Sequence, residues 1–121
     1  MAKPEAYSES EIERRLAAEL PGWTYTDGHL TRRYDTHNWK ATAMAIGAIA
    51  HLAEAAWHHP LLTASFPWVQ VQLQTHESMG ITDRDFELAR KIDEVLLWRP
   101  ENEGGALTGI PDDPKFAYLK K

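Results

Sequence analysis

Residues 68–76 read Trp-Val-Gln-Val-Gln-Leu-Gln-Thr-His, and this stretch decides the fold class. Apolar and polar side chains alternate along it, which is the pattern of a β-strand with one buried and one solvated face. Val69, Val71 and Leu73 are expected to face the core, with Thr75 at the next inward position. The alternate positions predict a solvated face or a surface where two sheets meet, and they are Gln70, Gln72 and Gln74.

Two other segments have the character of strands. Residues 23–34 predict a β-hairpin, because Asp27-Gly28 is a dipeptide that adopts the positive φ angles of a two-residue turn. This turn would place Tyr25 opposite Leu30. Residues 61–66, which end at a proline, are either a short strand or a connection.

Three segments predict helices. Ser8 and Ser10 each precede a glutamate by three residues, which is the spacing of a capping box, and apolar residues then recur every four positions. An Ala-rich helix is expected over residues 38–57, and a third helix over 83–97, capped by Thr82. The order of helix, two strands, helix, one or two strands and helix predicts an α+β fold with helices on one side of an antiparallel sheet.

Length and composition limit the possible functions. A chain of 121 residues is long enough for one domain, which we expect over residues 1–98, followed by an irregular tail over 99–121 that is rich in Pro and Gly. The net charge of -5 argues against nucleic acid as a partner, and the lack of cysteine excludes thiolate metal sites and cysteine nucleophiles. No leader or membrane-spanning segment is evident, so a soluble cytoplasmic protein is expected.

Three histidines, at the end of a predicted helix and at the end of a predicted strand, are candidates for acid–base chemistry. Residues 54–60 read Glu-Ala-Ala-Trp-His-His-Pro, and His76 ends the predicted strand. The unperturbed pKa of imidazole lies near neutrality, so histidines that converge in one pocket can give and take protons. We expect Pro60 to bend the chain so that His58 and His59 share a pocket. Glu54 lies one helical turn before His58 and is expected to hold it in one tautomer or keep it protonated.

Each of these residues also has a plainer interpretation. Two histidines at a helix C-terminus interact favourably with the helix dipole, and His76 could simply end a strand. The three histidines could instead hold zinc, although no His-x-His or His-x3-His pair anchors such a site, so acid–base chemistry is favoured. Asp85 is most simply a helix-cap carboxylate, and Trp23 a core aromatic.

The spacing resembles that of the pterin-4a-carbinolamine dehydratase family. The pattern is Glu-x3-His-His-Pro, then Thr-His sixteen residues after the proline, then a turn and an aspartate that opens a helix. The resemblance covers about residues 8–97. It implies a four-stranded antiparallel sheet with three helices packed on one face, and dimers or tetramers in which strands pair across subunits.

The resemblance also implies an activity, which is the removal of water from 4a-hydroxytetrahydropterin to give quinonoid dihydropterin. This reaction, 4a-hydroxytetrahydrobiopterin dehydration, recycles the pterin of aromatic amino-acid hydroxylases and needs no metal or other cofactor. The implied catalytic residues are His58, His59 and His76. The implied pterin-binding residues are Pro60, Thr75, Glu77 and Ser78. The implied supporting residues are Trp23, Glu54 and Asp85.

The chain departs from the family pattern at several positions. Trp57 stands where the family usually has Asp or Asn, Phe66 where it has Tyr or Trp, and Ser78 where a Cys can occur. A rival hypothesis is a non-catalytic binding protein, since similar folds serve as a transcription-factor dimerisation cofactor or as Rubisco assembly factors. The tail, which ends in Phe-Ala-Tyr-Leu and two lysines, could dock such a partner.

Overall fold

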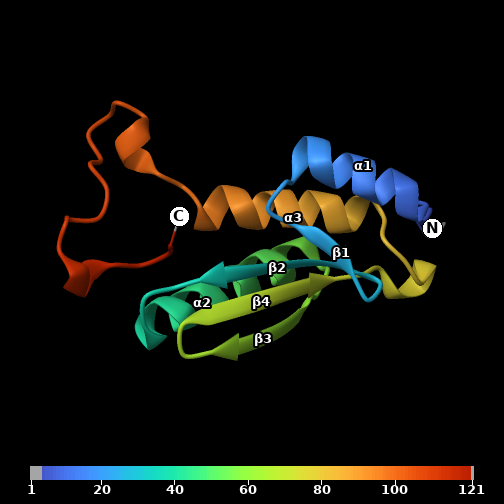
Figure 1. The fold of residues 1–121 in the computed structure, drawn as a ribbon, viewed down its shortest axis with the longest axis horizontal. Helices are drawn as coiled ribbons and strands as arrows, with labels where there is room; N and C mark the ends of the chain where they lie inside the picture. Colours follow the sequence, from blue (N-terminus) through green and yellow to red (C-terminus); the bar gives the residue numbers. More distant parts are fainter. Residues whose placement is uncertain (1–3, 121) are drawn as a thin grey trace.

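A computed structural model describes residues 4–120. Residues 1–3, at the start of the predicted domain, and Lys121, at the end of the predicted tail, lie outside the described residues. The three helices are α1 (Glu9–Glu19), α2 (Trp39–Ala56) and α3 (Asp83–Leu96). The strands are β1 (Thr24–Thr26), β2 (His29–Asp35), β3 (Leu61–Ser65) and β4 (Trp68–Leu73). Short 3-10 helices lie between β4 and α3 and in the segment after α3, namely η1 (His76–Ser78), η2 (Pro100–Asn102) and η3 (Pro114–Phe116). Figure 1 shows these elements in order.

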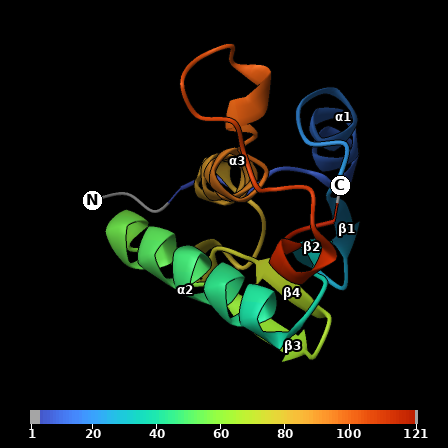
Figure 2. The ribbon, with the colours of Figure 1, turned by 90° about the vertical axis from the view of Figure 1, so that its left-hand side faces the viewer.

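The four strands form one antiparallel sheet in the order β1-β2-β4-β3, which confirms the predicted α+β class. Tyr25 pairs with Leu30 as the hairpin turn predicts. Residues 61–65 are a strand and not a connection, because they pair with β4 along their whole length. Helices α2 and α3 lie on the same side of the sheet (Figure 2).

The core lies between the sheet and the helices. The inward residues of β4 are completely buried, as their alternation with glutamine predicts. They meet apolar residues from all three helices, including Ile12 of α1, Ile49 of α2 and Phe86 of α3. Burying such large side chains contributes about 1.5–3 kcal/mol each, so this interface fixes how the helices sit on the sheet.

Hydrogen-bonded caps set the helix starts. Ser8, and not Ser10, caps α1 and forms the capping box with Glu11. Asn38 caps α2 through a bond from the Ala41 backbone N–H. Thr82 and Asp85 form the capping box of α3. Each cap satisfies backbone N–H groups that a helix leaves without partners in its first turn.

Strand β4 ends at Leu73, three residues before the predicted end at His76. Its neighbours run out at that point: Leu73 pairs with Leu30 near the start of β2, and Gln72 pairs with Leu61, the first residue of β3. A strand without partners has unpaired backbone groups. The chain instead closes a small loop in which Thr75 bridges Gly80 around η1.

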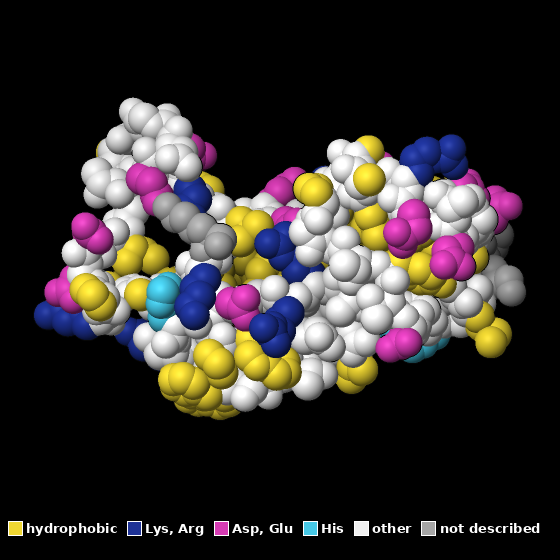
Figure 3. Space-filling view, in the orientation of Figure 1, with side chains coloured by type: hydrophobic (Ala, Val, Ile, Leu, Met, Phe, Trp, Pro, Cys, Tyr) yellow, Lys and Arg dark blue, Asp and Glu magenta, His cyan; other side chains and the backbone are white. Residues whose placement is uncertain are grey.

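The segment after α3 leaves the body of the protein and returns to it. Its last described residues attach to the end of β2: Leu119 bridges Thr36, and the Lys120 N–H donates to the Asp35 carbonyl. Between these ends the segment arches away, and Figure 3 shows an opening between it and the body. Within residues 4–120, no helix is both long and apolar enough to cross a membrane.

Candidate active site

The C-terminus of α2 directs the two adjacent histidines in different directions. Trp57 has φ 52° and ψ 48°, the left-handed conformation. The Trp57 N–H donates to the Glu54 carbonyl at 3.2 Å and the His58 N–H to the Ala53 carbonyl at 3.1 Å, which are the two bonds of a Schellman motif. The reversal at Trp57 therefore redirects the chain, before the bend that was expected at Pro60.

His58 turns inward and pairs with a carboxylate on α3. Its Nε2 lies 2.6 Å from Asp85 Oδ1. The side chain of His58 is 12% exposed and that of Asp85 is 0% exposed, so the pair is nearly removed from water. A hydrogen bond is electrostatically stronger in such surroundings than in water. Asp85 is thus both the helix-cap residue of the plainer interpretation and the partner of a histidine.

Buried donors hold Asp85 in place. Its Oδ2 accepts from Thr75 Oγ1 at 2.7 Å and from the Thr82 N–H at 2.9 Å. With Asp85 ionised, its oxygens can only accept, so the hydrogen shared with His58 belongs to Nε2. In the neutral imidazole, Nδ1 of His58 then keeps a lone pair, and no described residue forms a hydrogen bond with it. The pair therefore presents a positioned base.

Glu54 contacts His59, which corrects the expectation that it would hold His58. The Glu54 carboxylate lies 2.8 Å from His59 Nε2. The reason is the turn at Trp57, which directs His58 toward α3 and leaves His59 on the outer side with Glu54. Trp57 contacts the same imidazole edge to face, with ring centroids 5.0 Å apart. Both His59 and Glu54 are more than half exposed.

The loop after β4 brings the other predicted residues toward this region. Thr75 donates to the Asp85 carboxylate that pairs with His58. His76 is the next residue in the chain, so its backbone lies close to the His58–Asp85 pair. The side chain of His76 is exposed. Glu77 pairs with Arg84 in the first turn of α3, and Ser78 donates to the Pro4 carbonyl. Pro60 is half-buried immediately before β3.

Trp23, the remaining predicted supporting residue, lies in a different hydrogen-bond network from the histidines. Its Nε1–H donates to Asp93 at 3.1 Å, and its ring packs edge to face on Tyr34. Asp93 also accepts from the Tyr34 hydroxyl and from Arg32. Burial and the hydrogen bond to Asp93 raise the pKa of Tyr34 well above its usual range. Asp93 lies eight residues after Asp85 on α3, and we assign this cluster to the core.

Sequence reasoning missed three contributors to the site. The Thr82 hydroxyl, expected only to cap α3, also lies 2.7 Å from Thr75 Oγ1 and closes the network around Asp85. Arg84 pairs with Glu77 across the loop and the helix. Trp57 appeared only as a departure from a pattern, although an aromatic residue directly before two histidines was a usable signal.

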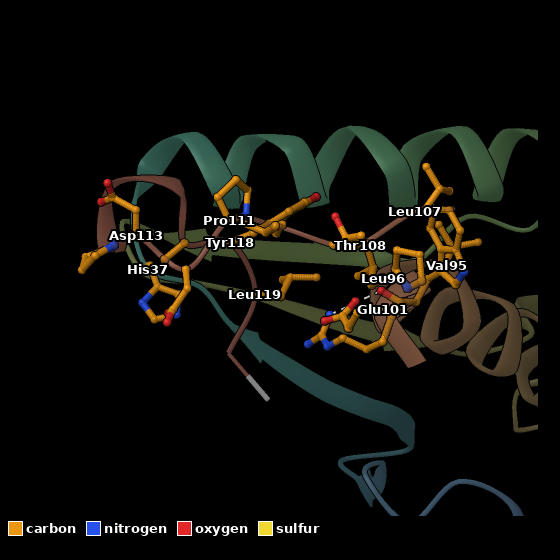
Figure 4. A pocket seen from close by; sticks show the side chains of 18 of the residues that line it. His37, Val95, Leu96, Glu101, Leu107, Thr108, Pro111, Asp113, Tyr118 and Leu119 are labelled. Atoms are coloured by element: carbon orange, nitrogen blue, oxygen red, sulfur yellow. Dashed lines mark hydrogen bonds between the residues drawn. The ribbon is translucent and has the colours of Figure 1, made fainter. Parts of the chain in front are cut away.

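A large cavity lies elsewhere, under the tail. It measures about 1070 Å³ and is lined by the end of α3 and by tail residues. Figure 4 shows Val95, Leu96, Leu107 and Leu119 around it, with His37 at one side. Its lining is mainly apolar and includes none of the residues of the His58–Asp85 pair.

Metal ligands do not converge in the described part of the chain. Within residues 4–120, no group of three or more His, Asp or Glu side chains is arranged to hold an ion. His58 and His59 have carboxylate partners of their own. The three-histidine zinc site, which was the weaker alternative, therefore gains no support from the arrangement of side chains.

Comparison with known proteins identifies a family over most of the chain. The family described as Pterin 4 alpha carbinolamine dehydratase matches residues 5–95. A protein of Aquifex aeolicus that is provisionally named a pterin-4-alpha-carbinolamine dehydratase is 48% identical over 89 residues, covering 74% of this chain and 89% of that protein. One from Sulfolobus acidocaldarius, named in the same way, is 36% identical and is covered to 94%.

A solved structure has the same fold. It is the crystal structure of a transcriptional coactivator/pterin dehydratase from Brucella melitensis, with a TM-score of 0.70 and 30% sequence identity. The superposition covers 76% of this chain and 99% of that one. The family match ends at residue 95, near the end of α3, so the tail lies outside it.

Proposed function

The chain belongs to the pterin 4 alpha carbinolamine dehydratase family, and from this premise we propose that it removes water from 4a-hydroxytetrahydropterin to give quinonoid dihydropterin. The observation that carries the proposal is the His58–Asp85 pair, a nearly buried imidazole held by a fixed carboxylate. The enzyme would be a hydro-lyase that recycles pterin.

The reaction requires two proton transfers and no change in oxidation state. The bond between the 4a-carbon and oxygen breaks as the hydroxyl takes a proton and leaves as water. The neighbouring ring N–H loses a proton, and a C=N bond forms. One group must act as acid and another as base, and each such group typically contributes about 10²–10⁴ in rate.

We assign these transfers to His58 and His76. His58 offers Nδ1 while Asp85 holds its other nitrogen. His76 follows Thr75, whose hydroxyl is bound to the same carboxylate, and its exposed imidazole is free to meet a ligand. His59, which is more than half exposed and held by Glu54, would position the pterin. Pro60, Thr75, Glu77 and Ser78 would line the pocket.

Single substitutions test these roles. His58→Ala and His76→Ala should lower kcat more than they weaken pterin binding, whereas His59→Ala should weaken binding at least as much as it lowers kcat. His37→Ala is the matched control, because His37 lies by the tail cavity, and it should change neither. If His58→Ala and His76→Ala both dehydrate at the wild-type rate, the assignment is wrong.

We also propose a homodimer or homotetramer assembled through the sheet. Strand β3 is an edge of the sheet, and an exposed edge offers unpaired backbone groups to another chain. Leu61 and Phe66, at the two ends of this edge, are each 58% exposed. Figure 3 shows apolar side chains gathered near the β3–β4 turn.

A second candidate function is a binding protein without catalysis. Two observations favour it: the solved neighbour is titled a transcriptional coactivator as well as a dehydratase, and the tail exposes Leu107 and Ile110 beside its cavity. Such a role could coexist with dehydration. A wild-type chain that binds pterin and leaves its dehydration at the spontaneous rate would favour this second candidate.

A further inference from the structure

Trp57 occupies a backbone position that suits glycine or asparagine. In a Schellman motif the left-handed residue is usually Gly, because a side chain there crowds the following carbonyl. Within residues 4–120, the non-glycine residues with positive φ are Asp27, Trp57 and Met79. Asp27 belongs to the hairpin turn, where Asp is common. Trp57 has no such explanation from local sequence preference.

Packing within the chain does not explain Trp57 either. Its side chain is 75% exposed, although indole is among the side chains that gain most from burial. The ring contact recorded for Trp57 is with His59, 5.0 Å away and at 82°. A strained residue that buries little is the kind of outlier that points to a function rather than to the fold.

The neighbours of Trp57 indicate where a ligand would lie. Glu54 holds Nε2 of His59, while the indole meets the same imidazole edge to face. The imidazole is thus fixed from two sides, and most of the indole remains open. A flat molecule stacked on the indole would lie nearly perpendicular to the plane of His59.

We propose that Trp57 is a substrate-binding residue whose indole stacks on the flat pterin ring and presents it to His59. The inference rests on the proposed function, which supplies a planar bicyclic heterocycle as the ligand. Indole offers a face of similar size, and stacking of a heterocyclic base on an aromatic side chain is favourable without any matching hydrogen bonds. Trp57 would therefore contribute to affinity for the ring more than to the proton transfers.

The test uses the full chain with Trp57→Asn and Trp57→Phe. Asparagine suits the left-handed conformation, so Trp57→Asn should raise Tm by roughly 2–6 °C. The same change should weaken binding of 7,8-dihydrobiopterin, a pterin that lacks the 4a-hydroxyl, by about 5- to 50-fold. Trp57→Phe should lose less affinity, and Trp39→Phe, an exposed control, none. A residue with a merely structural role would not make stability and affinity move in opposite directions.

The outcomes separate this inference from the proposed function. If the wild-type chain binds dihydrobiopterin and Trp57→Asn binds it equally well, the stacking role is wrong and the dehydratase proposal stands. If the wild-type chain binds no pterin, both are wrong. If Trp57→Asn changes the molecular mass in solution together with the affinity, the indole is a contact between copies, and the stacking role is overturned.

Discussion

Exchanging Asp85 for asparagine should separate the chemistry of the His58–Asp85 pair from its place in the fold. The change keeps the shape of the side chain and leaves one oxygen to accept from Thr75 and Thr82. The other oxygen, which faces His58 at 2.6 Å, becomes an NH2 group. A donor then faces a donor, unless His58 moves its proton from Nε2 to Nδ1.

The magnitude follows from the bonds involved. One hydrogen bond to a charged group in a buried site is lost, which costs about 1.5–3 kcal/mol of unfolding free energy, less if His58 changes tautomer. That change restores the hydrogen bond but removes the lone pair on Nδ1, so the base is lost. If His58 keeps its tautomer, Nδ1 keeps its lone pair, but the imidazole loses the carboxylate that orients it. We expect kcat to fall by about 10²–10⁴.

Asp93→Asn is the matched control for Asp85→Asn. Asp93 lies on the same helix and accepts from Trp23, Arg32 and Tyr34, with no histidine among its partners. Urea unfolding should show both variants destabilised, whereas initial-rate assays should show loss of dehydration only in Asp85→Asn. An Asp85→Asn enzyme within threefold of the wild-type kcat would refute the reasoning about the pair.

Three further predictions concern acid stability, assembly and metal content. The hydrogen bond from Tyr7, followed by the one from Arg15, holds the pKa of Asp83 below its usual value. The stability that these contacts contribute is present above the pKa of Asp83 in the unfolded chain, and it is lost as the pH falls through the pKa of Asp83 in the folded protein. Between pH 7 and about pH 3, the urea concentration at the unfolding midpoint should accordingly fall less for Asp83→Asn than for the wild type. Sedimentation should give a dimer or tetramer at micromolar concentration, and a monomeric mass at high concentration would count against assembly through the sheet. Elemental analysis should find no stoichiometric metal, and one tightly held zinc per chain with activity lost on chelation would contradict the proposed chemistry.

The sequence was informative where structure depends on neighbours in the chain. The box of Thr82 and Asp85 and the turn at Asp27-Gly28 were predicted correctly, because the bonds and dihedral angles involved span only a few residues. The alternation in residues 68–73 fixed which side of β4 is buried. Its end at Leu73 was missed, because a strand ends where its partners end, and those partners come from elsewhere in the chain.

The sequence indicated which residues to examine as a candidate site, but only part of how they contact one another. The spacing along a helix predicts that Glu54 contacts His58, and this contact would form if the helix continued past Ala56. The left-handed Trp57 reverses the chain first, so Glu54 contacts His59 while His58 contacts Asp85. The latter pair joins residues 27 positions apart. Its geometry depends on the packing of α2 and α3, which no local pattern reveals.

The initial rate of dehydration of 4a-hydroxytetrahydropterin tests the central claim most directly. We predict that the wild-type chain accelerates the reaction well above its spontaneous rate at neutral pH, and that a His58→Ala, His76→Ala double variant that remains folded returns it to within a few fold of that rate. A wild-type chain with no acceleration, or a double variant with the wild-type rate, would contradict histidine-driven dehydration.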